Sequence, residues 1–148
     1  MSEFNRNPPR KLFTLVFVKS RNRLLLGLKK RGFGVGKWNG FGGKVDQGET
    51  VIEGAVRELQ EECGLVIPIT NLNHLGCIVY KDVDYDREVH IFTTEIKEVK
   101  KLNIIESDEM CPKWFNFNEI PYDRMWDDAK HWTNYVLTDT KIGCYVFF

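Results

Sequence analysis

One segment, residues 43–65, constrains the fold and chemistry of this chain more than any other. It reads Gly43-Lys-Val-Asp-Gln-Gly-Glu49, then seven residues, then Arg57-Glu58-Leu59-Gln60-Glu61-Glu62-Cys63-Gly64-Leu65. If residues 51–63 form a helix, Glu58, Glu61 and Glu62 lie at positions i, i+3 and i+4 and share one face. These carboxylates repel one another, and they lie near the helix C-terminus, where the helix dipole favours cations. A bound divalent cation would offset that repulsion, since Mg²⁺ binds carboxylates together with substrate phosphates.

A solvated acidic helix face is the alternative interpretation of this segment, and such faces are common. The combination of features argues against it. The spacing is fixed across the whole segment, glycines stand at both ends, and Arg57 lies next to Glu58. We therefore interpret the segment as a metal site for phosphate chemistry.

Length and composition fit a single domain, residues 1–148. A chain of 148 residues buries about two-thirds of its unfolded surface, and 43% hydrophobic residues supply a core. Lys plus Arg and Asp plus Glu number 21 each, so the net charge gives no reason to expect binding to a nucleic-acid polymer. Locally, Lys29, Lys30, Arg31 and Lys37 precede the acidic helix and suit a polyphosphate. A solvated basic loop is the alternative.

The cysteines and the N-terminus bear on the compartment. None of the four cysteines forms a C-x-x-C pair, which is typical of free thiols in a reducing compartment. Residues 1–11 lack the apolar run of a signal peptide, and no 18-residue apolar run occurs elsewhere. We therefore expect a cytoplasmic protein with no membrane partner. A nuclear or mitochondrial fraction is the alternative.

The rest of the sequence predicts several strands and few helices. Apolar runs bounded by turn residues predict strands at 12–18, 23–28, 75–83, 88–95, 110–117 and 143–148. Residues 38–45 predict a short strand followed by a glycine turn. A second helix is predicted over residues 130–137, after a short helical stretch at 121–125. This pattern favours an α/β or α+β fold in which helices cover a mixed sheet.

The acidic helix carries its own start and stop signals. Thr50, with Glu53 three residues later, predicts a capping box. Apolar residues recur every four positions from Val51 to Cys63 and should face the core. Gly64 should end the helix in the left-handed conformation.

Residues 43–65 meet every defined position of the Nudix box, G-x5-E-x7-R-E-U-x-E-E-x-G-U with U aliphatic, so the chain resembles the Nudix hydrolases. In that family the glutamates bind Mg²⁺ or Mn²⁺ and help to activate water. The water hydrolyses a nucleoside diphosphate linked to another group. The resemblance implies an α/β fold, a Nudix-type α/β/α sandwich with a mixed β-sheet.

The similarity extends beyond the box to the animal MutT homologues, a Nudix subfamily acting on oxidised purine nucleoside triphosphates. Segments 12–16, 25–45, 106–115 and 120–126 carry it. The resemblance implies a monomeric, Mg²⁺-dependent pyrophosphohydrolase whose partner is a small-molecule nucleoside triphosphate. It would convert 8-oxo-dGTP or 2-hydroxy-dATP to the monophosphate and pyrophosphate. The alternatives are another Nudix substrate, such as a dinucleoside polyphosphate, or a catalytically silent Nudix binding module.

The resemblance also implies roles for individual residues. The expected catalytic residues are Arg57, Glu58, Glu61 and Glu62, with Arg57 paired to Glu49. The expected metal ligands are the Gly42 carbonyl, Glu58, Glu61, Glu62 and Glu109. The expected substrate-binding residues are Thr14, Lys29, Asn39, Phe41, Gly42, Gly43, Lys44, Trp126, Asp127 and Asp128.

The sequence departs from these relatives around the expected base pocket. Relatives carry a Trp, one spacer residue and then Asp-Asp, whereas Trp126 is followed directly by Asp127 and Asp128, then Ala129. Either the spacer is deleted and both aspartates remain, or only Asp128 aligns and Ala129 replaces its partner. A pair of aspartates at a base would share a proton, because adjacent like charges cannot both ionise cheaply.

A second departure lies in segment 80–87. It places Asp82 and Arg87 where the relatives are apolar. Both departures leave the selectivity for the base open, and neither touches the expected metal chemistry.

Overall fold

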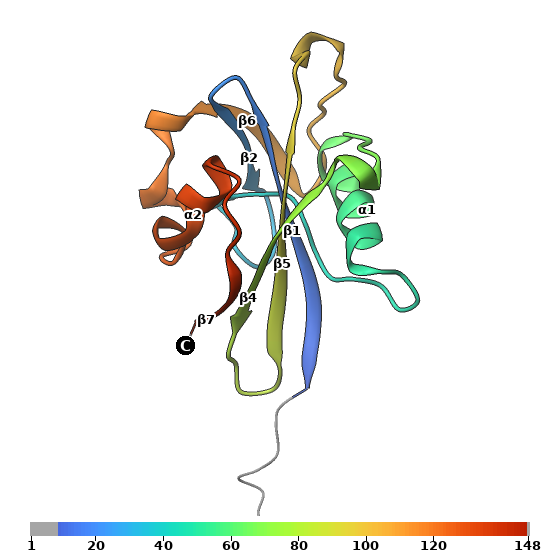
Figure 1. Ribbon diagram of the computed structural model, residues 1–148, viewed down its shortest axis with the longest axis vertical. Coiled ribbons are helices and arrows are strands. Elements are labelled where there is room, and N and C mark those ends of the chain that lie inside the picture. The colour runs from blue at the N-terminus through green and yellow to red at the C-terminus, as the bar shows by residue number, and fades with distance from the viewer. Residues whose placement is uncertain (1–8, 148) are drawn as a thin grey trace, which may run out of the picture.

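The computed structural model describes residues 9–147, which form a mixed sheet with one helix on each face (Figure 1). Residues 1–8, in which no signal peptide is expected, and Phe148 lie outside this range. The strands are β1 (Arg10–Ser20), β2 (Arg23–Lys29), β3 (Trp38–Asn39), β4 (Asn73–Tyr80), β5 (Asp86–Glu95), β6 (Met110–Asn116) and β7 (Gly143–Phe147). The helices are α1 (Val51–Cys63) and α2 (Ala129–Leu137), with short 3-10 turns η2 (Ile69–Asn71), η3 (Val99–Lys101), η4 (Phe117–Glu119) and η5 (Tyr122–Arg124).

Strand β1 lies at the centre of the sheet. The strand order is β3-β2-β1-β5-β4-β7, and β6 also pairs with β2. β1 runs parallel to β5 over ten register pairs, from Arg10 opposite Asp86 to Lys19 opposite Glu95. β7 is parallel to β4, and the remaining pairings are antiparallel. The predicted α/β/α sandwich with a mixed sheet is confirmed.

The two faces of the sheet form two separate cores. Val16 and Val18 point to the α1 side, where they pack with Leu59, whereas Phe17 points to the α2 side and packs with Trp132. β1 is therefore buried on both faces, which explains why its sequence is apolar without alternation. Along the described chain, no helix has both the length and the apolar character needed to cross a membrane.

Helix α1 begins and ends as the sequence predicts. The Thr50 hydroxyl accepts from the Glu53 N–H at 3.2 Å, and the Glu53 carboxylate accepts from the Thr50 N–H at 2.7 Å, so the capping box is complete. Gly64 adopts a φ of 80° and donates to the Gln60 carbonyl. Cys63, in the last turn, is buried against the sheet with its thiol free.

Several predicted boundaries were wrong. β4 ends at Tyr80 rather than 83, because Val83 is 92% exposed and lies in the turn between β4 and β5. β5 begins at Asp86, whose buried carboxylate accepts from Lys81 at 2.8 Å. The short strand and glycine turn expected within 38–45 are present, and the strand, β3, is two residues long. Beyond it, Phe41 and Lys44 each make an isolated bridge to β1.

One buried cation ties β1 to the end of helix α2. Lys19 is 3% exposed, and its ammonium group donates to the Val136 carbonyl at 2.9 Å and pairs with Asp139 at 2.8 Å. A cation at a helix C-terminus is favoured by the helix dipole and satisfies a terminal carbonyl.

Replacing Lys19 with Met should lower the free energy of unfolding by about 1–3 kcal/mol, because both acceptors lose a buried, charged donor. Chemical denaturation measures this change. Lys113→Met is a suitable control, since Lys113 is exposed and its ammonium group lies 5.2 Å from the Phe115 ring centroid, with no ion pair to it among residues 9–147. The control should stay within about 0.5 kcal/mol of the wild type. Equal stability of the two variants would contradict the assigned role of Lys19.

Candidate active site

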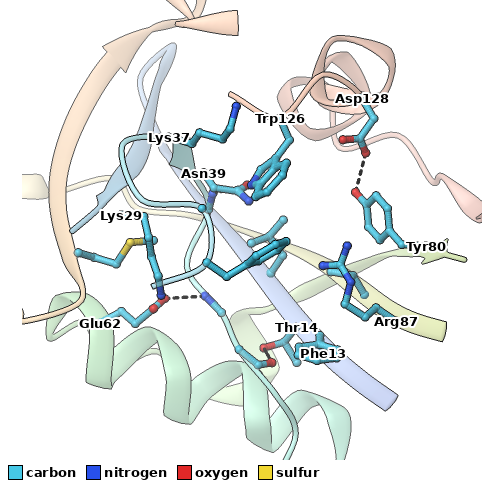
Figure 2. A pocket seen from close by; sticks show the side chains of 18 of the residues that line it. Phe13, Thr14, Lys29, Lys37, Asn39, Glu62, Tyr80, Arg87, Trp126 and Asp128 are labelled. Carbon is cyan, nitrogen blue, oxygen red and sulfur yellow. Dashed lines mark hydrogen bonds between the residues drawn. The ribbon is translucent and has the colours of Figure 1, made fainter. Parts of the chain in front are cut away.

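A cavity of about 480 Å³ lies between the sheet, the glycine turn that follows β3 and the segment before α2 (Figure 2). Residues from β1, β2, β4 and β5, the loop at 30–37, the turn at 39–43 and the segment before α2 form its wall. Most of the expected substrate-binding residues lie on it: Thr14, Lys29, Asn39, Gly42, Gly43, Trp126, Asp127 and Asp128.

Two of the expected substrate-binding residues lie elsewhere. Phe41 is fully buried in the core beneath α1, where its backbone bonds to Val16 in both directions. Lys44 is exposed, and its carbonyl accepts from Arg57 at 3.0 Å. Neither belongs to the cavity wall. The backbone hydrogen bonds of Phe41 and Lys44 hold the glycine turn that lies between them.

Gly42 and Gly43 bring this turn into direct contact with β1 and α1. A Cβ atom on Gly42 would lie 1.8 Å from the Thr14 carbonyl oxygen, and one on Gly43 would lie 2.6 Å from Glu58 Oε1. A side chain at Gly42 would clash with the β1 backbone, and one at Gly43 would displace the Glu58 carboxylate, so the close approach depends on glycine at both positions. The Thr14 N–H donates to the Gly43 carbonyl at 2.9 Å.

Arg57 contacts four carboxylates and the Lys44 carbonyl beside the turn, and its ion pair with Asp46 is 3.3 Å long. It donates to both oxygens of Glu49, with 2.7 Å as the shortest distance, as predicted for this pair. It also donates to Glu58 at 3.0 Å and to Glu61 at 3.2 Å. The Glu49 contacts hold the pKa of Arg57 above its ordinary value. One guanidinium fork therefore fixes the positions of three carboxylates.

The three helix glutamates differ in burial although they share a helix face. Glu62 is 5% exposed, and its Oε1 accepts from the Gly42 N–H at 2.8 Å. Burial raises the pKa of Glu62 to about 7. Burial also raises the pKa of Glu58, against the opposing effect of Arg57. Glu61 lies toward solvent, with 57% of its side chain exposed.

The expected metal ligand Glu109 is held by two cations. It pairs with Lys29 at 3.0 Å and with Arg31 at 2.8 Å. Both contacts lower the pKa of Glu109, and the Lys29 contact has the larger effect. Over residues 9–147, no three His, Cys, Asp or Glu side chains already converge as a metal site. The ligand set expected from the sequence is therefore not assembled as it stands.

The deep carboxylates nevertheless suit a divalent cation. Glu62 lines the cavity and its Oε1 accepts from the Gly42 N–H, whereas Glu58 lies behind Gly43, a residue of the cavity wall. Hydrogen bonds from described residues engage only Oε1 of each carboxylate. Oxygen-only donors are what Mg²⁺ prefers. A cation would also stabilise charges that burial disfavours.

The other side of the cavity is aromatic and polar. Trp126 stacks on Phe33 with ring centroids 5.0 Å apart. Asp128, 4% exposed, accepts through Oδ2 from the Tyr80 hydroxyl at 2.6 Å and from Trp132 Nε1 at 3.0 Å. Figure 2 shows Asp128, Tyr80 and Arg87 on the side of the cavity away from Glu62.

The structure distinguishes the two neighbouring aspartates. Both line the cavity, but Asp127 is exposed and Asp128 is buried. Among residues 9–147 no hydrogen bond joins them, so a proton-sharing pair is not formed here. Ala129 lies in the core on the α2 side, away from the cavity wall. One buried aspartate, supported by a tyrosine and a tryptophan, occupies the place expected for two.

Phe33, Tyr80 and Arg87 are wall residues that the motif does not predict. Tyr80 and Arg87 are register partners across β4 and β5. Arg87 lies two residues before Val89, which also lines the cavity, so the two share a face of β5. Strand periodicity alone could have placed Arg87 on this face, but not at this cavity.

Comparisons with known proteins agree with this geometry. Residues 8–136 match the NUDIX domain family. The chain is 44% identical over 140 residues to the oxidized purine nucleoside triphosphate hydrolase of Danio rerio, covering 93% of this chain and 86% of the relative. A protein of the same name from Mus musculus is 44% identical over 133 residues, 88% of this chain and 82% of the relative. The crystal structure of the mutator MutT protein from Bacillus halodurans shares the fold, with a TM-score of 0.72 at 19% identity, covering 93% of this chain and 90% of that chain.

The raised pKa of Glu62 predicts a pH-dependent stability. Its folded value of about 7 lies above its ordinary value of 4.5, so the folded protein binds this proton more tightly. The associated stability is present below pH 4.5 and is lost as the pH rises through 7, by up to about 3 kcal/mol. Glu62→Gln keeps an acceptor for Gly42 without a charge. In EDTA it should therefore be more stable than the wild type at pH 8 and equally stable at pH 4.

Urea unfolding across this pH range tests the expectation. The matched control is Glu53→Gln, the same change on the same helix, where glutamine also completes a capping box. The Thr50 backbone N–H lowers the pKa of Glu53, so this variant should not gain stability at pH 8. A Glu62→Gln protein no more stable than the wild type at pH 8 would refute the buried-charge interpretation.

Proposed function

The chain belongs to the NUDIX domain family, and we propose that it hydrolyses oxidised purine (deoxy)nucleoside triphosphates to the monophosphate and pyrophosphate with Mg²⁺. The observation that carries this proposal is that one cavity joins three kinds of group. The buried carboxylate of Glu62 stands at one end, cations lie along the wall, and an aromatic and acidic surface stands at the other end. A nucleoside triphosphate presents the matching sequence of metal-bound phosphates, sugar and base.

The phosphate end is organised by charge. Glu58, Glu62 and the Gly42 carbonyl would hold the metal ion, with Glu61 and Glu109 at its periphery. Mg²⁺ there would neutralise phosphate charge and lower the pKa of bound water. Arg57 positions Glu58 and Glu61 through its fork of donors. Lys29 lines the cavity beside Glu62 and would meet a phosphate oxygen, sharing its charge with Glu109.

The base end is organised by stacking and by polar groups of fixed direction. Asn39 Oδ1 accepts from the Gly40 N–H at 2.8 Å, which leaves its NH₂ group to donate into the cavity. Asp128 presents its remaining oxygen, Oδ1. Trp126 and Phe33 offer apolar rings against which a purine can stack. A donor and an acceptor on the wall of one cavity suit a purine edge.

The proposal also covers the domain organisation, oligomeric state and compartment of the protein. We expect residues 1–148 to act as one domain and as a monomer on a small-molecule substrate in the cytoplasm. A balanced charge and one shared sheet support that expectation. A silent binding module is disfavoured, because clustered and buried carboxylates are costly without a cation.

Pyrophosphate release tests the proposal directly. We expect kcat/KM to be higher for 8-oxo-dGTP or 2-hydroxy-dATP than for dGTP, dATP and diadenosine polyphosphates, and to require Mg²⁺. Glu62→Gln should lower kcat by at least about 100-fold, the scale of one metal or base contribution, while nucleotide binding persists. Glu53→Gln is the control on the same helix and should turn over normally. A Glu62→Gln protein with near-normal turnover at saturating Mg²⁺ would remove Glu62 from the reaction.

Asp128→Asn should change the group that faces the cavity at this position from a hydrogen-bond acceptor to a donor. Trp132 Nε1 can only donate, so the asparagine oxygen must turn toward it and toward Tyr80, and the NH₂ group must face the cavity. An acceptor thereby becomes a donor. The ratio of kcat/KM for 2-hydroxy-dATP over dATP should fall by about 10- to 100-fold.

Asp127→Asn separates this effect from a general loss of acidic charge. Asp127 lies on the same wall but is exposed, so a smaller change in the ratio is expected. An unchanged ratio in Asp128→Asn would mean that the base is read elsewhere. A loss of similar size in both variants would mean that two aspartates share the task.

A further inference from the structure

Arg87 lies on the cavity wall with its charge unmatched. Its guanidinium stands 4.8 Å from the centroid of the Tyr80 ring and 5.5 Å from that of the Phe33 ring. Within the part of the chain that the structure describes, no carboxylate forms an ion pair with it. Aromatic rings hold a guanidinium in place without using its N–H groups. Arg87 therefore offers a fixed set of donors to whatever enters the cavity.

Asp128 supplies an acceptor on the same wall. It is the residue before α2, a position where aspartate commonly caps the helix, yet its side chain makes no capping bond. Its Oδ2 instead accepts from Tyr80 and Trp132, which leaves Oδ1 for a ligand. Tyr80 connects the two polar groups, since its ring lies under Arg87 and its hydroxyl bonds to Asp128.

Arg87 stands away from the phosphate end. Figure 2 shows Arg87, Tyr80 and Asp128 together on one side of the cavity, with Lys29 and Glu62 on another. Lys29 already lies beside the carboxylates that would hold the metal ion. The cation beside Asp128 is therefore placed for the base rather than for the phosphates.

We propose that Arg87 and Asp128 together read a purine lactam edge, a ring N–H adjacent to a carbonyl, which makes Arg87 a specificity-determining residue. This inference rests on the proposed function. Arginine can only donate, so it meets the carbonyl, and the Asp128 oxygen meets the N–H. Adenine has neither group, but its 2-hydroxy derivative in the oxo form has both. Guanine carries a lactam edge before and after oxidation at C8.

The proposal therefore predicts an effect that differs between the two purines. Arg87→Met should lower the ratio of kcat/KM for 2-hydroxy-dATP over dATP by about 10- to 100-fold, the scale of a bidentate base contact. The ratio for 8-oxo-dGTP over dGTP should change by less than about threefold, because both members of that pair present a lactam edge. Arg87→Lys, which keeps the charge but not the fork, should fall between Arg87→Met and the wild type.

Arg23→Met is the matched control. Arg23 also lies over an aromatic ring, that of Trp114 at 5.3 Å, but it is outside the cavity wall. The substitution removes the same charge and the same kind of ring contact. Both substrate ratios should stay at their wild-type values.

Binding of the product monophosphates gives a readout that does not depend on turnover. Calorimetry in EDTA should show that the wild type prefers 2-hydroxy-dAMP to dAMP and that Arg87→Met loses this preference. An equal loss for all four triphosphates would overturn the proposal, because Arg87 would then serve the phosphates. An unchanged adenine ratio, or no wild-type preference between the monophosphates, would overturn it too.

The same measurements separate the two proposals. If the wild type hydrolyses no oxidised purine triphosphate but still prefers 2-hydroxy-dAMP through Arg87, the proposed function fails and the reading of the lactam edge stands. If hydrolysis is selective and Arg87→Met leaves it so, the proposed function stands and the role of Arg87 fails.

Discussion

Gly42 and Gly43 press a backbone turn against β1 on one side and α1 on the other. The space that a Cβ atom would need at either position is filled by the Thr14 carbonyl or by the Glu58 carboxylate. This close approach lets the Gly42 N–H reach Glu62 and the Gly43 carbonyl reach Thr14. A side chain at Gly42 would push the turn away from β1, and one at Gly43 would displace the Glu58 carboxylate, so the contact of Gly42 with Glu62 depends on this packing.

This packing brings several carboxylates close together, and Arg57 forms hydrogen bonds with three of them. Arg57 bonds to Glu49, Glu58 and Glu61 and to the Lys44 carbonyl, so it links the turn to the helix. Glu62 lies beyond its reach and is met by one backbone N–H, which does not balance a full charge. The residual cost appears as raised pKa values at Glu58 and Glu62. A site strained in this way gains stability when a cation arrives.

On the wall opposite Glu62, hydrogen bonds rather than ion pairs fix the positions of the polar groups. Tyr80 and Trp132 both donate to one oxygen of Asp128, so the other oxygen has a defined task. Arg87 lies over the Tyr80 ring and completes the wall with donors. This wall therefore carries one buried aspartate with its two donors, one exposed aspartate and an arginine.

The sequence by itself determined what depends on near neighbours along the chain. The bounds of α1 follow from Thr50, Glu53 and Gly64, and the spacing of the glutamates identifies their shared face and the family. Tertiary structure decided the rest, because burial depends on which distant elements meet. It placed Glu62 inside and Glu61 outside, moved Phe41 from the cavity to the core, and joined Tyr80 to Asp128 across 48 positions. These contacts arise from the strand order, which sets β1 between β2 and β5 and brings the β4 end to the start of α2. No local pattern encodes that order.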